Sequence, residues 1–263
     1  MQFRTRGALT SLSFIDSPRL SAGITLANRG QPFGPFGFAG TPTRRHSVAT
    51  VAAHRRALAE FLGLPAESLI LQRQVHGVTV AEGATQRPPA LWRALNHRDL
   101  PESDILISDR PGRALVLSVA DCCPVLLFDP VTGAIAAAHA GWRGTASGAA
   151  KEAVRALRTG YGAHPAALRA WVGPCAGRES YEVGGEVVEA FRDYPDCMRP
   201  SGRPAHALLD ISEINRRQLL EAGVPAQAIR VADFDTIRDL RFHSYRRDGA
   251  DSGRMAAWIA LGG

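Results

Sequence analysis

Two histidines and one cysteine stand where expected strands end in short turns, and their side chains are suited to binding one metal ion. The segments are Gln74-Val75-His76-Gly77, Asp121-Cys122-Cys123-Pro124 and His139-Ala140-Gly141-Trp142. Rigid scaffolds often present functional groups at the ends of strands. Two imidazoles and one thiolate, from His76, Cys122 and His139, leave one position open, which is the arrangement of a catalytic zinc site. Such a metal lowers the pKa of bound water toward neutrality and so makes a nucleophile.

The spacing alone leaves a structural role open for each of these residues, because they lie dozens of positions apart. A hydrogen-bonded structural histidine would explain His76 or His139, and a small buried hydrophobic residue would explain Cys122. A second chemical interpretation needs no metal. Cys122 would then be a thiolate nucleophile and His139 its base, as in a cysteine hydrolase or deamidase. Cys122 and His139 are therefore catalytic candidates in both interpretations.

Further candidates accompany these three residues in the sequence. Asp121 precedes Cys122, where it would accept a hydrogen bond from a ligand residue, act as a general acid or base, or only form the turn. Arg143 lies in a Gly-flanked loop before an expected helix, and would hold an anion there or form a structural salt bridge. Tyr181 would line a pocket or cap the following helix. Arg246 is the last substrate-binding candidate, and we expect one buried and one solvated side chain in the pair Arg246-Arg247.

The four cysteines do not predict a disulfide framework. Cys122 and Cys123 are adjacent and cannot form an ordinary unstrained bridge, and nothing in the sequence indicates export. A reduced chain with a metal-binding or catalytic thiol is favoured. We expect Cys123, Cys175 and Cys197 to lie in packing or at the surface.

The elements that must position these residues mix strands and helices without strict βαβ alternation. Helical spacing of apolar residues predicts a helix over residues 47–62 and another from Thr145 to about Arg158. Further helices are expected at about 185–192, at 210–223 with a capping box of Asp210 and Glu213, and at 255–261. The expected strands are residues 69–75, 105–108, 114–120, 125–128, 134–138, 168–172 and 229–232. This order predicts one α/β domain with mixed sheets, spanning residues 1–263.

Composition excludes several classes of protein. The chain has 263 residues, of which 45% are hydrophobic and 21% charged, so it is not disordered. Its longest apolar stretch, Ala114 to Phe128, is interrupted by Asp121 and Pro124, whereas crossing a bilayer takes about 20 apolar residues. No apolar run follows the first residues, so we expect a cytoplasmic protein without a secretory signal. The net charge is +6, but the arginines are scattered, so nucleic-acid binding is not expected and an anionic small molecule fits better.

A set of longer motifs resembles one protein family in the family's own order. The motifs are Gln74-Val75-His76-Gly77, Ser103-Asp104-Ile105-Leu106, Val119 to Val125, Ala138 to Gly144, Gly173-Pro174, Tyr181 to Gly184, Ser244 to Gly249 and Gly253-Arg254. They resemble the YfiH-like family, also called the laccase-domain or multicopper polyphenol oxidase family, whose bacterial members are described as peptidoglycan editing factors. The resemblance runs from about Leu58 to the C-terminal end.

The resemblance implies a fold, a metal and a reaction. The fold would be a four-layer α/β/β/α sandwich with mixed sheets, in one YfiH-like domain of residues 1–263. His76, Cys122 and His139 would be zinc ligands. The activity would be phosphorolysis of adenosine, inosine and methylthioadenosine together with adenosine deamination, so the partners are a purine nucleoside and phosphate. No membrane or nucleic-acid partner is expected, and the chain would be a monomer or a small homo-oligomer. A multicopper centre fits poorly, since the chain has only eight dispersed His.

The sequence departs from the family pattern mainly near its N-terminus. The family's Arg-x-Gly-Gly and Asn-Leu-Gly are not intact, although Arg19 is a remnant candidate, and the Asn-Arg of the first helix reads His54-Arg55. Because of these changes, the resemblance predicts less about which nucleosides the chain accepts. The three expected zinc ligands are all present. The alternative function is a cysteine hydrolase or amidase that edits peptidoglycan precursors with Cys122 as nucleophile. A third is a non-enzymatic cell-wall or division partner with a structural zinc.

Overall fold

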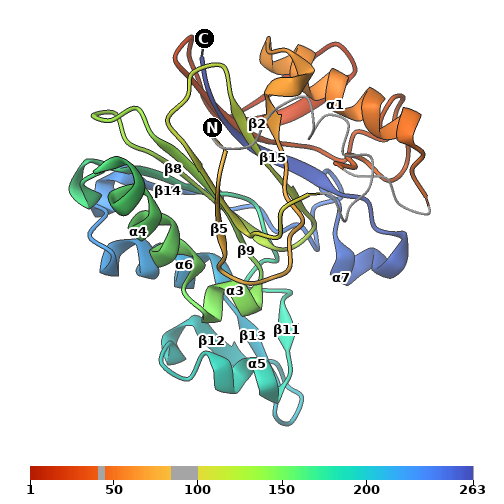
Figure 1. Cartoon of the computed structure of the whole chain (residues 1–263). Helices are drawn as coiled ribbons and strands as arrows, with labels where there is room; N and C mark the ends of the chain where they lie inside the picture. Colours follow the sequence, from red (N-terminus) through yellow and green to blue (C-terminus); the bar gives the residue numbers. More distant parts are fainter. Residues whose placement is uncertain (41–44, 84–99, 263) are drawn as a thin grey trace.

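The structure is a computed structural model of the chain, and it describes residues 1–40, 45–83 and 100–262. Two six-stranded sheets pack face to face, with α1 (Val48–Leu62) on one side and α4 (Ala149–Tyr161) and α6 (Ile211–Glu221) on the other (Figure 1). This is the α/β/β/α arrangement that the resemblance implied. None of the described helices is long and apolar enough to cross a membrane.

The first sheet has the strand order β1-β2-β3-β15-β7-β4. All its pairs are antiparallel except β4 with β7, so the sheet is mixed. The strands are β1 (Gln2–Arg6), β2 (Leu9–Asp16), β3 (Leu20–Thr25), β15 (Met255–Leu261), β7 (Ala114–Val119) and β4 (Leu69–Ile70). The hairpin of β1 and β2 was not expected from the sequence.

The helix expected at 255–261 is wrong, because these residues form the central strand β15. All seven side chains are buried. Met255, Ala257 and Ile259 face the second sheet, whereas Ala256 and Trp258 face α1. A strand that is covered on both faces reads as a continuous apolar run, and such a run cannot be told from a buried helix by its periodicity.

The second sheet has the order β14-β10-β8-β9-β6-β5 and is also mixed, with parallel pairs at its two edges. The strands are β14 (Ile229–Val231), β10 (Arg169–Val172), β8 (Cys123–Phe128), β9 (Ile135–Ala140), β6 (Ile105–Ser108) and β5 (Val80–Glu82). Strands β6, β8, β9, β10 and β14 were expected within two residues of these bounds. The expected strand 69–75 is paired regularly only over its first part, as β4, and continues as extended chain toward His76.

The two ends of α1 and the start of α6 lie where the sequence places their caps. The Ser47 side chain accepts from the Thr50 N–H at the start of α1, and Gly63 ends this helix in the left-handed region. The Asp210 side chain accepts from the Glu213 N–H at the start of α6, as the capping box predicted. The helix expected from Thr145 is divided into α3 (Trp142–Ala146) and α4.

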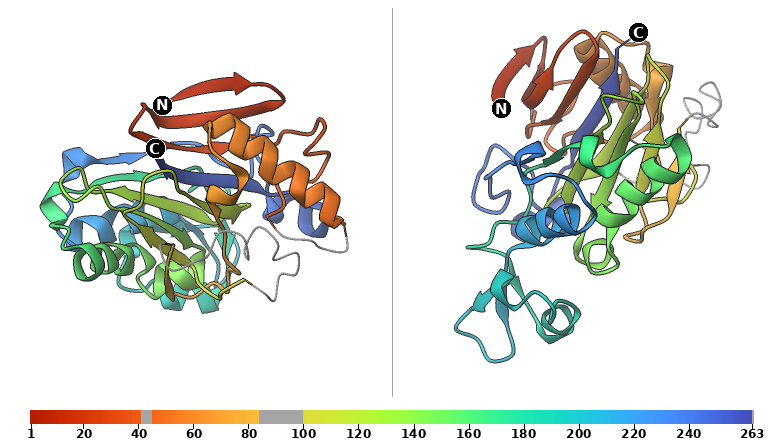
Figure 2. Two further views of the ribbon diagram at one scale, coloured as in Figure 1. Left: turned by 45° about the horizontal axis from the view of Figure 1, so that its top comes forward. Right: turned by 90° about the vertical axis from the view of Figure 1, so that its left-hand side faces the viewer.

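A small third sheet projects from one end of the sandwich beside α5 (Gly185–Ala190), as the right-hand view of Figure 2 shows. Its strands are β11 (Glu182–Val183), β13 (Ala207–Leu209) and β12 (Met198–Pro200), in that order across the sheet. The remaining helical segments are α7 (Tyr245–Asp248) and the short 3₁₀ turns Ala66–Ser68, Pro165–Ala167, Pro195–Cys197, Ala226–Ala228 and Gly249–Asp251.

Three apolar clusters fill the three interfaces of the sandwich. One lies between the two sheets, one between the first sheet and α1, and one between the second sheet and the pair α4 and α6. The last cluster buries Cys123, Cys175 and Cys197, and all four cysteines are free. These three cysteines were expected in packing or at the surface, and all three are buried.

Candidate metal centre

The folded chain brings His76, Cys122 and His139 together. Their potential ligand atoms all lie within 4.8 Å of one another. His76 ends the extended segment that follows β4, Cys122 lies between β7 and β8, and His139 lies near the end of β9. His139 is only 3% exposed, Cys122 is half-buried, and His76 is exposed, so the cluster opens to solvent on one side.

The buried carboxylate of Asp104, just before β6, joins two of the three ligand turns. Asp104 is fully buried, and its Oδ1 lies 2.8 Å from His139 Nδ1. The same carboxylate accepts from the backbone N–H groups of residues 75, 76 and 77 at 3.2, 3.0 and 2.7 Å. Burial by itself raises the pKa of Asp104, but these hydrogen bonds outweigh it and hold the pKa below its usual range. An ionised Asp104 makes His139 Nδ1 the donor, which leaves Nε2 free as a ligand.

Two ligand turns contain backbone in the left-handed region, which residues other than glycine rarely adopt. The φ angles are 63° at His76 and 79° at Asp121. A third constraint is Gly141: a Cβ built there would lie 3.0 Å from Cys122 Sγ and 3.2 Å from His76 Cδ2. A Cβ at position 141 would therefore press on both ligands, which would have to move by a few tenths of an ångström.

The charges within the cluster favour a thiolate. Burial raises the pKa of the Cys122 thiol, but His139 and His76 act against it and lower the pKa to about 6. Burial alone would lower the pKa of His139. The neighbouring Cys122 thiolate and the Asp104 carboxylate outweigh burial, so the pKa of His139 is raised. Before any metal binds, Cys122 and His139 thus favour a thiolate–imidazolium pair.

The donor set and its spacing fit one tetrahedral zinc ion. Zinc–nitrogen and zinc–sulfur distances of about 2.1 and 2.3 Å require ligand atoms roughly 3.5 Å apart in a tetrahedral site. The three ligand atoms lie within 4.8 Å of one another, so small side-chain movements would close the site around an ion. The Cys122 thiolate already has the protonation state that metal binding needs, and a bound metal ion would displace the Nε2 proton of His139.

A cavity of about 580 Å³ opens onto this cluster. Its polar lining includes Arg254 and Tyr245 from the C-terminal segment, Gln74 from the segment after β4, and Ser118 from β7. Arg254 Nη1 donates to the backbone oxygens of Ser252 and Gly253 at 3.2 and 2.8 Å, which fixes the guanidinium. A half-buried arginine beside a metal cluster is suited to holding an anion.

Asp121 anchors the C-terminal segment to the ligand turn. Its carboxylate accepts from Thr236 Oγ1 at 2.6 Å, Ser244 Oγ at 3.0 Å and the Arg246 N–H at 2.6 Å. Of the roles considered from the sequence, these contacts favour positioning over acid–base chemistry, since three donors already occupy the carboxylate. Arg254 and Tyr245 belong to the segment that these bonds hold in place.

The other three substrate-binding candidates lie outside this cavity's lining in the described part of the chain. Arg143 is exposed, stacks 4.1 Å above the Trp142 ring and lies 3.6 Å from Glu186. Tyr181 is buried, and burial together with the charge of Cys122 raises its pKa to about 12. Arg246 lies 5.1 Å above the Tyr181 ring and donates to the Glu182 backbone oxygen. Tyr181 and Arg246 thus lie together beside β11 of the small third sheet, and Arg143 lies beside Glu186 of α5.

Sequence reasoning did not assign roles to Asp104 or Arg254. Both stand in segments that matched the family, Ser103-Asp104-Ile105-Leu106 and Gly253-Arg254. The match to these motifs could have marked both residues as candidates. It did not show which atoms Asp104 or Arg254 would contact.

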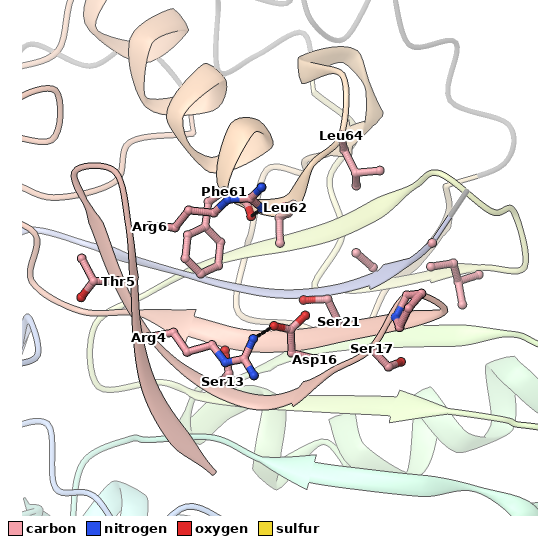
Figure 3. Close-up of a pocket in the computed structure, with 14 residues that line it drawn as sticks. Arg4, Thr5, Arg6, Ser13, Asp16, Ser17, Ser21, Phe61, Leu62 and Leu64 are labelled. Carbon is pink, nitrogen blue, oxygen red and sulfur yellow. Dashed lines mark hydrogen bonds and ion pairs between the residues drawn. The ribbon is translucent and has the colours of Figure 1, made fainter.

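A second cavity, of about 690 Å³, lies between the N-terminal hairpin and the end of α1 (Figure 3). Arg4 forms an ion pair with Asp16 there, and Arg6 Nη1 donates to the Phe61 backbone oxygen at 2.9 Å. Over residues 1–40, 45–83 and 100–262, the one cluster of His, Cys and acidic groups suited to a metal is His76, Cys122 and His139. The cavity at that cluster is therefore the candidate functional site.

The family model that matches the chain is described as multi-copper polyphenol oxidoreductase laccase, and it covers residues 25–262. A purine nucleoside phosphorylase of Xylella fastidiosa is 39% identical over 215 residues, which are 80% of this chain and 78% of that protein. Purine nucleoside phosphorylase YlmD of Geobacillus stearothermophilus is 35% identical over 248 residues, covering 90% of this chain and 89% of that protein.

The solved structures include the same fold. The crystal structure of YlmD from Geobacillus stearothermophilus superposes with a TM-score of 0.86 and 32% sequence identity, covering 99% of this chain and 98% of the other. The two layers of mixed sheet described above are therefore an arrangement that this chain shares with a solved relative.

Proposed function

The chain belongs to the multi-copper polyphenol oxidoreductase laccase family, and we propose that it is a zinc-dependent purine nucleoside phosphorylase. The observation that carries the proposal is the convergence of His76, Cys122, His139 and Arg254 on one cavity. The names of its relatives support the reaction class. We further propose that adenosine, inosine and methylthioadenosine are substrates and that the same site deaminates adenosine.

The chain's own residues would position the reactants for phosphorolysis. Arg254 would hold phosphate beside the cluster, since a fixed guanidinium matches two phosphate oxygens. An oxygen of hydrogen phosphate then attacks the anomeric carbon and the glycosidic C–N bond breaks. The departing base takes up the electrons of that bond and the proton that the hydrogen phosphate gives up. Arg254, rather than the exposed Arg143, has the placement for the anion.

His76, Cys122 and His139 would hold the zinc ion. When bound, zinc would supply Lewis-acid polarisation of an oxygen or nitrogen atom of the reactants. Asp104 would keep His139 in the tautomer that leaves Nε2 toward the ion. Asp121 would act as a positioning residue, because its hydrogen bonds hold the segment that carries Arg254.

A product assay with measured metal content tests this proposal. Purified protein with inosine and phosphate should release hypoxanthine and ribose 1-phosphate, and adenosine should give adenine and some inosine. The Cys122→Ala variant should lose both the activity and the one zinc ion per chain. Product formation no higher than in Cys122→Ala would overturn the proposal, as would full activity in protein stripped of metal.

A second candidate is a cysteine hydrolase or amidase acting on peptidoglycan precursors. Two contacts favour it. The Asp104 carboxylate lies 2.8 Å from His139 Nδ1, and the His139 ring lies beside the Cys122 thiol. That is the arrangement of an oriented base next to an activated nucleophile. Amide cleavage that persists in strong chelator and is lost in Cys122→Ala would support this candidate against the first.

A further inference from the structure

A short N-terminal segment, residues 36–40, pairs with Arg254 and reaches the cavity wall. The Arg254 N–H donates to the Phe36 backbone oxygen at 2.9 Å, and the Phe38 N–H donates to the Arg254 backbone oxygen at 2.9 Å. Gly40, at the end of the segment, lines the cavity together with Arg254. The two backbone hydrogen bonds fix the main chain from which the Arg254 side chain projects.

Two glycines let these two stretches of backbone approach closely around a buried histidine. A Cβ at Gly37 would overlap the Arg254 backbone oxygen and the His243 ring. A Cβ at Gly253 would overlap the same ring, which is only 1% exposed. Because the packing is this close, the Arg254 backbone has little room to move unless residues 36–40 move with it.

His54 of α1 holds the same segment by a hydrogen bond to its backbone. The His54 side chain is fully buried, and its Nδ1 accepts from the Ala39 N–H at 3.0 Å. Its Nε2 lies 2.8 Å from the Pro32 backbone oxygen, which can only accept, so Nε2 carries the proton. Burial lowers the pKa of His54, and the neutral ring is the form that both contacts need.

Arg55, the next residue of α1, bonds to the end of the segment that lines the cavity. Its Nε donates to the Gly40 backbone oxygen at 3.0 Å, and its Nη2 donates to the same oxygen. The side chain is 1% exposed, and burial lowers its pKa to about 10. Arginine is rarely buried so completely, because removing its charge from water is costly. Together, His54 and Arg55 set the position of residues 39 and 40.

We propose that His54 and Arg55 are positioning residues for Arg254, acting through residues 36–40. The inference rests on the proposed phosphorolysis, in which Arg254 holds phosphate. Within the described part of the chain, the residues that line the cavity include Gly40 and Arg254 but neither His54 nor Arg55. The two residues of α1 would therefore act on the phosphate site without touching a reactant.

The first test compares KM for phosphate with KM for inosine, both from initial rates. Arg55→Met and His54→Ala should each raise KM for phosphate about three- to tenfold, within the range of coupling between contacting residues, and KM for inosine much less. His54→Asn should restore most of the phosphate affinity, because its Oδ1 is bonded to Cγ as Nδ1 is and can accept from the Ala39 N–H. Arg56→Met is the matched control, since Arg56 follows on α1 but is exposed, and it should keep both parental KM values.

A double-mutant cycle tests whether the effect passes through Arg254. In an Arg254→Gln background, Arg55→Met and His54→Ala should cause no further increase in KM for phosphate. The same factor in both backgrounds overturns the inference, as does an unchanged KM for phosphate in the single variants. Asp129→Asn, at a fully buried aspartate outside the cavity's lining, controls for lost stability and should keep the parental value. If Arg55→Met does not fold, the His54 variants carry the same comparison.

Binding of inorganic phosphate to metal-free protein separates this inference from the proposed function. Calorimetry should show binding that is weakened by Arg254→Gln, by Arg55→Met and by His54→Ala. A parent protein that binds phosphate in this pattern but cleaves no nucleoside overturns phosphorolysis and leaves the positioning role standing. Phosphate binding that Arg254→Gln leaves unchanged overturns the positioning role, whether or not nucleosides are cleaved.

Discussion

Replacing Asp104 by Asn should weaken zinc binding as well as lower the stability of the fold. A matched variant at another buried aspartate separates the two effects. Four N–H groups converge on the Asp104 carboxylate: His139 Nδ1 and the backbone of residues 75, 76 and 77. An asparagine has one oxygen, which can accept from two of them, and its NH2 group would face the other two donors. About two charge-assisted hydrogen bonds are lost.

The expected magnitudes follow from these contacts. A hydrogen bond to a charged group contributes about 1.5–3 kcal/mol, so Asp104→Asn should lower the free energy of unfolding by about 3 kcal/mol or more. The His139 ring and the His76 turn would also lose their common support. Removing a partner of this kind typically weakens metal binding by about 10–100-fold.

The assay measures both quantities on the same variants. The zinc dissociation constant comes from competition with a chromophoric chelator, and the free energy of unfolding from urea denaturation of metal-free protein. Asp129→Asn is the matched control, because Asp129 is also fully buried and accepts from the Val131 N–H and the Thr132 hydroxyl, at the opposite end of β8 and β9. It should lose stability but keep parental zinc affinity. Parental zinc affinity in Asp104→Asn, or equal weakening in Asp129→Asn, would refute the reasoning.

Three further predictions test other parts of the site. In metal-free enzyme, alkylation of Cys122 should increase with pH around a midpoint near 6, because its pKa is lowered, and zinc should suppress it. The remaining cysteines are buried and should stay unmodified, and a midpoint near that of an ordinary thiol, about 8.5, would count against a thiolate. Arg254→Gln should raise KM for phosphate about tenfold or more and KM for the nucleoside much less, as measured by initial rates; equal effects on both would contradict an anion role. Gly141→Ala places a Cβ 3.0 Å from Cys122 Sγ and should weaken zinc binding at least about tenfold by chelator competition, whereas Gly160→Ala on α4 should leave it unchanged.

Local signals in the sequence predicted the elements whose ends are fixed by nearby residues. The cap of α6 depends on Asp210 and Glu213, three positions apart, and both the pattern and the contact are present. The three strand-end turns suggested the ligand set, and the resemblance to the family implied it. Its expected geometry is supported by the 4.8 Å cluster of ligand atoms.

Features that depend on distant parts of the chain were not predicted. The role of Asp104 rests on contacts with residues 75–77 and 139, which no local pattern reveals. The contact between Gln72 and Ser103, 31 positions apart, likewise follows no local pattern. Strand β15 was read as a helix because burial on both faces removes the alternation that marks a strand.

The position of β15 within the first sheet has a consequence for how the chain folds during synthesis. It pairs with β3 on one side and β7 on the other, yet it comes last among the strands in chain order. Until residues 255–261 leave the ribosome, β3 and β7 each expose an unpaired edge, and such edges favour aggregation. The turn that carries Cys122 follows β7 directly, so the nascent chain completes its metal ligands well before the sheet that supports them.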